Sequence, residues 1–83
     1  MGQVAVVLKI MPEAMEKFEE LKEAVVKQMK PYKLEEQPVA FGIVALIATF
    51  VVEDGAGGSD ILEQKAAALP NVGSAEVSSV DRL

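Results

Sequence analysis

An 83-residue chain of which 51% is hydrophobic and 25% charged has the composition of one folded domain, spanning residues 1–83, and not of a disordered segment. Eight Lys and Arg against thirteen Asp and Glu give a net charge of −5, which argues against direct binding to nucleic-acid phosphates. Because the chain has no Cys and no His, it lacks thiolate metal sites and the usual catalytic bases and nucleophiles, so we expect no metal, no cofactor and no enzymatic activity of its own.

The first third of the chain predicts a strand and a helix. In residues 3–11 the even positions are all large and apolar while the odd positions are mixed, which is the period-two pattern of a strand with one buried face. Pro12 is expected to stop this strand and to occupy the first turn of a helix that runs to about Lys30, before Pro31. Apolar residues at spacings of three and four predict its inner stripe: Met15, Phe18, Leu21, Val25 and Met29.

The middle of the chain contains its longest apolar run. Residues 33–37 predict a strand at a sheet edge, since Pro38 cannot donate a backbone hydrogen bond and charged side chains protect a free edge. Residues 39–42 then make a corner, and residues 43–53 predict a strand that is apolar on both faces. A strand of this kind has something covering both faces, so we place it in the centre of the sheet.

The last third predicts a second helix and a fourth strand. Residues 55–58 form a loop whose glycine spacing does not match a phosphate-binding loop, and Ser59 or Asp60 is expected to cap the helix that follows. Pro70 and Asn71 close this helix, and the last strand begins near Val72 and continues to the end of the chain. The expected inner stripe of the helix comprises Ile61, Leu62, Lys65, Ala66 and Leu69.

The order β-α-β-β-α-β indicates an α+β fold, the ferredoxin-like split β-α-β sandwich. Its four antiparallel strands would take the order 4-1-3-2, with two helices on one face. No element remains to cover the other face, toward which Val44, Leu46, Phe50 or their neighbours must point. This open sheet face is either a surface for a partner or for self-association, or a face of scattered apolar side chains with no such role.

Other classes of function find little support in the sequence. The acidic pairs Glu35–Glu36 and Glu53–Asp54 are neighbours in strands, so their side chains point to opposite faces and are better read as solvated edges than as acid and base. An RNA-recognition sheet would carry aromatics on its central strands, whereas the first strand has none and Phe50 stands alone. The N-terminus lacks the features of a signal peptide, and the longest apolar run is far shorter than the roughly 20 residues that span a membrane. We therefore expect a soluble, cytoplasmic chain that binds neither nucleic acid directly nor membranes.

Several segments resemble the guanine-exchange domain of translation elongation factor 1-beta. These are Pro-Val-Ala-Phe-Gly-Ile at residues 38–43, Val-Val-Glu-Asp at 51–54 and Val-Ser-Ser-Val-Asp at 77–81. The opening Val-Ala-Val-Val-Leu-Lys-Ile-Met-Pro-Glu and the final Asp-Arg-Leu are most similar to the stand-alone archaeal form. The resemblance extends over nearly the whole chain. It implies the fold derived above and a partner, the GTPase elongation factor 1-alpha, from which the factor releases GDP so that GTP can bind.

The resemblance also implies which residues contact the partner. The aromatic of the Phe-Gly corner in that family docks on the GTPase, a role that matches Phe41 beside Gly42. A basic residue near the C-terminus disturbs the magnesium and phosphate site, a role that Arg82 would take after the matching Asp81. The residues alone leave two other interpretations open, in which Phe41 packs against the core and Arg82 belongs to a solvated terminus.

An alternative function uses the open sheet face. A ferredoxin-like domain with an apolar open face could bind a small ligand or form a homo-oligomer. An obligate oligomer without affinity for the GTPase would favour that interpretation over nucleotide exchange.

Overall fold

The computed structural model describes residues 2–53 and 58–82. Within these residues the secondary structure follows the predicted order, and it consists of β1 (Gln3–Pro12), a 3₁₀ turn (Met15–Lys17), α1 (Phe18–Ala24), a π-helical segment (Val25–Met29), β2 (Lys33–Pro38), β3 (Val44–Glu53), α2 (Gly58–Ala67) and β4 (Val72–Arg82). No helix in this described part is long and apolar enough to cross a membrane.

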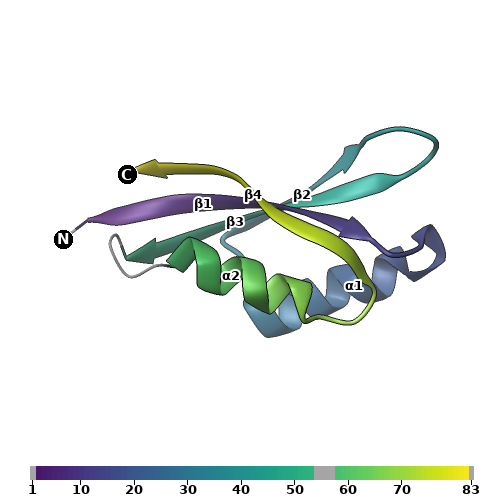
Figure 1. Ribbon diagram of the computed structural model, residues 1–83, viewed down its shortest axis with the longest axis horizontal. Coiled ribbons are helices and arrows are strands. Elements are labelled where there is room, and N and C mark those ends of the chain that lie inside the picture. The colour runs from purple at the N-terminus through teal and green to yellow at the C-terminus, as the bar shows by residue number, and fades with distance from the viewer. Residues whose placement is uncertain (1, 54–57, 83) are drawn as a thin grey trace.

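The strands form an antiparallel sheet in the order β2-β3-β1-β4, which confirms the predicted order read from its other end. Both α1 and α2 lie on the same side of this sheet, so the fold is the expected two-layer sandwich (Figure 1). The β2–β3 hairpin curves away from the helical layer at one end of the molecule, while the two chain termini lie toward the other end (Figure 1).

The hydrophobic core lies between the sheet and the helices. In β1 the even positions face the helices, and Val6, Leu8 and Ile10 are completely buried, as the period-two pattern predicts. Their cross-strand partners on β3 are also on this inner face, because residues opposite each other in antiparallel strands point to the same side. The buried cluster is completed by Val4, Phe18, Leu21, Val25, Leu46, Ala48, Phe50, Ala66 and Leu69.

The open sheet face carries other residues than those first named for it. Leu46 and Phe50 are in the core, and Val44 packs against it, so these three point toward the helices. Their neighbours Ile47, Thr49 and Val51, which are half-buried, therefore line the open face of β3, whereas Ala45 on the same face is completely buried. The sequence could not decide between the two faces because both are apolar, and a one-residue shift in register would exchange them.

The start of the first helix differs from the prediction. Pro12 does not enter a helical turn but continues β1, where it is the register partner of Val72. The extended path continues to Glu13, whose backbone N–H donates to the carbonyl of Asn71 at 2.8 Å. Helical structure begins only at Met15, and Met15 itself is 36% exposed instead of buried. The end near Lys30 is confirmed, since Lys30 takes the left-handed conformation with φ 50°.

The second helix also differs in detail. Ser59 and Asp60 lie inside its first turn and not at its N-cap, because α2 already begins at Gly58. Ile61 is 51% exposed and Lys65 is exposed, so the inner stripe of α2 is limited to Leu62 and Ala66, and the buried Leu69 follows the end of the helix at Ala67. Of the loop predicted at residues 55–58, Gly58 is instead the first residue of α2. Residues 55–57, together with Asp54, lie outside the described residues.

A bulge joins β4 to the end of β1, and it predicts an effect on stability. Met11 pairs with Ser74 and Pro12 with Val72, which leaves Gly73 as the extra residue. A Cβ at Gly73 would lie 2.9 Å from the Pro12 carbonyl oxygen and 3.2 Å from the Glu13 Cα, both of them backbone atoms that cannot easily move.

We expect Gly73→Ala to lower the free energy of unfolding by about 1–3 kcal/mol, because the added methyl group must push the two strands apart. Urea unfolding followed by circular dichroism measures this change. Gly2→Ala is the matched control, since a Cβ at Gly2 meets nothing within 4 Å. Equal stability of the two variants would contradict the close approach at the bulge.

Candidate functional site

A tight turn connects β2 to β3 at the projecting end of the sheet. The Ile43 N–H donates to the Ala40 carbonyl at 3.0 Å, and the Val39 N–H donates to the Ile43 carbonyl at 2.9 Å. The two residues between them have positive φ, 56° at Phe41 and 75° at Gly42, which is the combination of a type I′ hairpin turn. Glycine adopts this conformation freely, whereas it costs a residue with a side chain roughly 1–2 kcal/mol. A bulky aromatic at positive φ is therefore a strained feature of the kind that gathers at functional sites.

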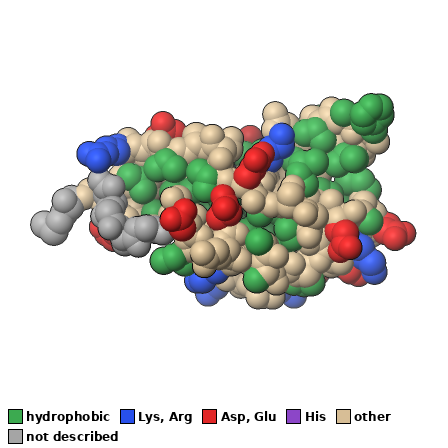
Figure 2. Space-filling model, in the orientation of Figure 1, with side chains coloured by type: hydrophobic (Ala, Val, Ile, Leu, Met, Phe, Trp, Pro, Cys, Tyr) green, Lys and Arg blue, Asp and Glu red, His purple; other side chains and the backbone are tan. Residues whose placement is uncertain are grey.

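The Phe41 ring is fully exposed, at 101% of its reference area, and no large hydrophobic residue in the described part of the chain is more exposed. Hydrophobic side chains gather at the tip of the hairpin, away from the body of the molecule (Figure 2). The interpretation in which Phe41 packs against the core is wrong. A rigid turn thus presents an apolar ring to solvent, which is a suitable anchor for a protein interface.

Two further apolar residues lie at this hairpin, and no sequence motif marks them as part of the site. Val39 is 39% exposed on the strand that enters the turn. Met15 supports the strand that leaves it, since its Sδ atom accepts the backbone N–H of Val44 at 3.3 Å. We call Met15, Val39 and Phe41 the hairpin patch. The sequence signal for Met15 was misleading because its spacing fits a helical stripe that in fact begins three residues later, at Phe18.

Asp81 and Arg82 lie at the opposite end of the sheet from the hairpin patch (Figure 1). In the register of β4 against β1, Asp81 is paired with Ala5 and Arg82 with Val4. Val4 is six residues from Ile10, the β1 residue nearest the hairpin in the pairing with β3, so the two regions are separated by at least about 20 Å. The Cα positions of the molecule extend over 41 × 21 × 16 Å. The predicted contact residues therefore form two regions, Phe41–Gly42 and Asp81–Arg82, and not one site.

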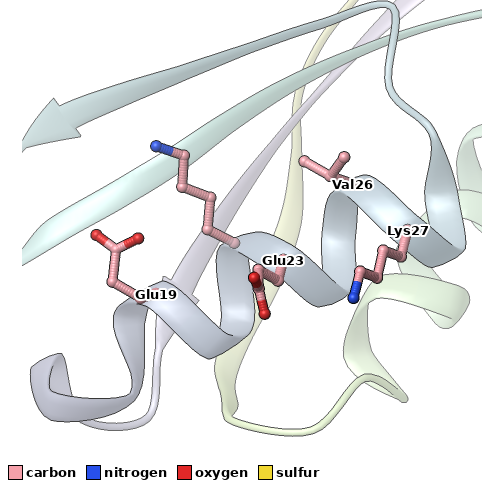
Figure 3. Close-up of a pocket in the computed structure, with 5 residues that line it drawn as sticks. Glu19, Glu23, Val26 and Lys27 are labelled. Carbon is pink, nitrogen blue, oxygen red and sulfur yellow. The ribbon is translucent and has the colours of Figure 1, made fainter.

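A hollow of about 320 Å³ lies along the outer side of α1, and it carries no candidate site. Its labelled side chains, Glu19, Glu23, Val26 and Lys27, spread along the helix instead of converging (Figure 3). Lys22 also lines it and reaches across to the edge strand, where its Nζ atom lies 2.6 Å from the Glu36 carboxylate. In residues 2–53 and 58–82, no three acidic side chains come together in a way that could hold a metal ion.

The contact between α1 and β2 can be tested by titration. The hydrogen bond and the charge of Glu36 raise the pKa of the Lys22 ammonium above its ordinary value of 10.5. The ion pair therefore contributes stability below pH 10.5 and loses it as the pH rises through the folded-state pKa. We expect Glu36→Gln to lower the Lys22 pKa, as measured by an alkaline NMR titration of its side chain. Glu23→Gln, on the same helix, is the control, and an equal shift in both variants would contradict the assigned partner.

Fold and surface together define the class of protein: a small ferredoxin-like domain that presents a solvent-exposed aromatic on a strained hairpin. The sequence profile of the EF-1 guanine nucleotide exchange domain matches residues 5–83. Over 88 residues, covering all of this chain and 99% of the relative, the sequence is 41% identical to elongation factor 1-beta of Methanobrevibacter smithii. It is 42% identical over 87 residues to the protein of that name in Methanosphaera stadtmanae and 36% identical over 88 residues to that in Haloarcula marismortui, each aligned over the whole of this chain. The chain belongs to the elongation factor 1-beta family.

Proposed function

We propose that this domain is a guanine nucleotide exchange factor that promotes the release of GDP from the GTPase elongation factor 1-alpha during translation elongation. The family assignment supports this role. The structural observation that carries the proposal is the fully exposed Phe41 ring, held at positive φ on a projecting hairpin. Such a ring contributes nothing to the core of its own domain, while its burial against a partner would release about 25 cal/mol per Å² of apolar surface removed from water.

The mechanism follows from thermodynamic linkage. A factor that binds the nucleotide-free GTPase more tightly than the nucleotide-bound form must weaken nucleotide binding by the same ratio. The domain makes and breaks no covalent bond in this process, so it acts as a binding partner and not as an enzyme. In this proposal Phe41 anchors one end of the domain on the GTPase, with Gly42 allowing the tight turn. At the other end Asp81 and Arg82 reach the nucleotide site, where a guanidinium suits recognition of phosphate oxygens.

The separation of the two regions gives the interaction its geometry. Because they lie at least about 20 Å apart on one rigid sheet, simultaneous contact fixes the orientation of the domain on the GTPase. The second contact is then an intramolecular event once the first has formed, which raises affinity without enlarging either surface. A partner in translation also fits the cytoplasmic location expected from the sequence.

The proposal is tested by loading the cognate elongation factor 1-alpha with fluorescent GDP and following its release in excess GTP. We expect the chain to accelerate release in a concentration-dependent and saturable manner. A GTPase that does not act in translation serves as the control and should be unaffected. Release at the intrinsic rate, with the GTPase fully active and the chain in large excess, would overturn the proposed function.

The alternative of a ligand-binding or oligomerising module receives no support from the relatives. Light scattering after size exclusion separates the two. A large obligate oligomer without affinity for the GTPase would favour the alternative, whereas a complex that forms with the GTPase favours exchange.

A further inference from the structure

A second exposed aromatic, Tyr32, lies between the helical segment and β2. Its N–H donates to the Thr49 carbonyl at 2.7 Å, just before β2 begins at Lys33, the register partner of Thr49, so the backbone of Tyr32 is tied to β3. Its side chain is 79% exposed. An aromatic side chain on an ordered backbone has few rotatable bonds, so it loses little conformational entropy when it contacts a partner.

The ring of Tyr32 borders two hollows. One, of about 400 Å³, is lined by Gln3, Ala5, Tyr32 and Val51 and lies on the open sheet face, where Ala5 and Val51 are cross-strand partners. The other, of about 370 Å³, lies at the edge of β3 beyond the start of β2, and it is lined by Met29, Lys30, Tyr32, Phe50, Val51, Val52 and Leu62. We call the first one the Tyr32 hollow. Its lining combines the apolar side chains of Ala5 and Val51 with the aromatic side chain of Tyr32.

Carboxylates flank the Tyr32 hollow. Asp81 is the register partner of Ala5 on the adjacent strand, and Glu53 is the register partner of Gln3, so both stand on the face that carries the hollow. Among nearby cations, the Lys33 ammonium lies 2.7 Å from the Glu35 carboxylate, and Lys30 lines the neighbouring hollow. Arg82 follows Asp81 but is paired with the inward-facing Val4, so it stands on the other face of β4. An aromatic ring beside two carboxylates is the arrangement that binds a cationic side chain, through the face of the ring and through charged hydrogen bonds.

We propose that the Tyr32 hollow receives an Arg or Lys side chain of the partner GTPase, as a contact beyond those of Phe41 and of the chain end. This inference rests on the proposed exchange function. The charge around the hollow selects a basic occupant, and the overall charge of −5 acts in the same direction. Asp81 links the hollow to the terminal contact region, so a GTPase seated at Asp81 and Arg82 would also cover Tyr32.

The test uses the same nucleotide-release assay and measures the concentration of chain that gives half-maximal acceleration. We expect Tyr32→Ala to raise this concentration about three- to tenfold, the range of a cation–aromatic contact, and Tyr32→Phe to keep it within about twofold because the ring remains. Glu53→Gln should raise it at low ionic strength, and this difference should shrink in high salt as the charge is screened. Val26→Ala, a 48% exposed position on the outer side of the helical layer, is the matched control.

The outcomes separate this inference from the function on which it rests. Acceleration by the wild-type chain together with an unchanged Tyr32→Ala variant would overturn the Tyr32 contact and leave exchange intact. A loss in Tyr32→Ala that depends neither on salt nor on Glu53 would overturn the basic occupant. If the wild-type chain accelerates nothing, both proposals fail. Circular dichroism verifies folding, and Glu53→Gln, which leaves the ring untouched, decides the matter if Tyr32→Ala is unfolded.

Discussion

Phe41→Ala is expected to slow stimulated GDP release at least about tenfold at subsaturating concentrations while leaving the domain folded. The expected loss corresponds to the removal of an aromatic anchor from an interface, which commonly costs about 2 kcal/mol or more of binding free energy. The fold should not change, because the ring is fully exposed and stabilises no neighbour. Its free energy of unfolding should remain within about 0.5 kcal/mol of the wild type.

Two companion variants of the same residue sharpen this experiment. Phe41→Tyr keeps an aromatic ring and should retain most of the exchange activity. Phe41→Gly removes both the ring and the cost of a Cβ at φ 56°, so it should lose exchange while being at least as stable as Phe41→Ala. A variant that is more stable but less active would show that the backbone strain at Phe41 is retained because the ring is needed for binding. Exchange at the wild-type rate in Phe41→Ala, with the purified pair, would remove Phe41 from the site.

Much of the fold could be predicted because local patterns and topology agree. The even positions of β1 are apolar and the odd positions mixed, and the structure buries the even set. Charged residues and Pro38 predicted an edge strand, and β2 is an edge strand. The exposure of Phe41 could also be anticipated, because a residue beside a turn glycine and outside both alternating runs has no core position to occupy.

Other features depend on contacts between distant segments, which no local pattern contains. The extension of β1 through Pro12 requires the pairing with Val72, and it delays the helix until Met15. No local pattern singles out Tyr32, because its position beside Val51 depends on a backbone hydrogen bond to Thr49 on another strand. The separation of Phe41–Gly42 from Asp81–Arg82 likewise follows from the register of the strands, because the sequence contains no information on the distance between the two regions.

Leu21→Ala is expected to give the largest loss of stability, about 2–5 kcal/mol in the free energy of unfolding. Leu21 is completely buried in the face of α1 that packs on the sheet, and removal of its side chain leaves a cavity among rigid neighbours. A domain of this size has roughly 5–15 kcal/mol in total, so the variant should unfold at much lower denaturant concentration.

A comparison of two helix variants distinguishes residues that stabilise the fold from residues that contact the GTPase. Val26→Ala, on the outer side of the same helical stretch, should change the free energy of unfolding by no more than about 0.5 kcal/mol. Leu21→Ala should lower exchange only in proportion to the fraction unfolded, since α1 serves to hold the sheet that separates Phe41 from Arg82. Equal destabilisation by both variants, measured by urea unfolding, would mean that α1 does not pack on the sheet through the face assigned here. A loss of exchange in fully folded Leu21→Ala would instead place the helical layer in contact with the GTPase.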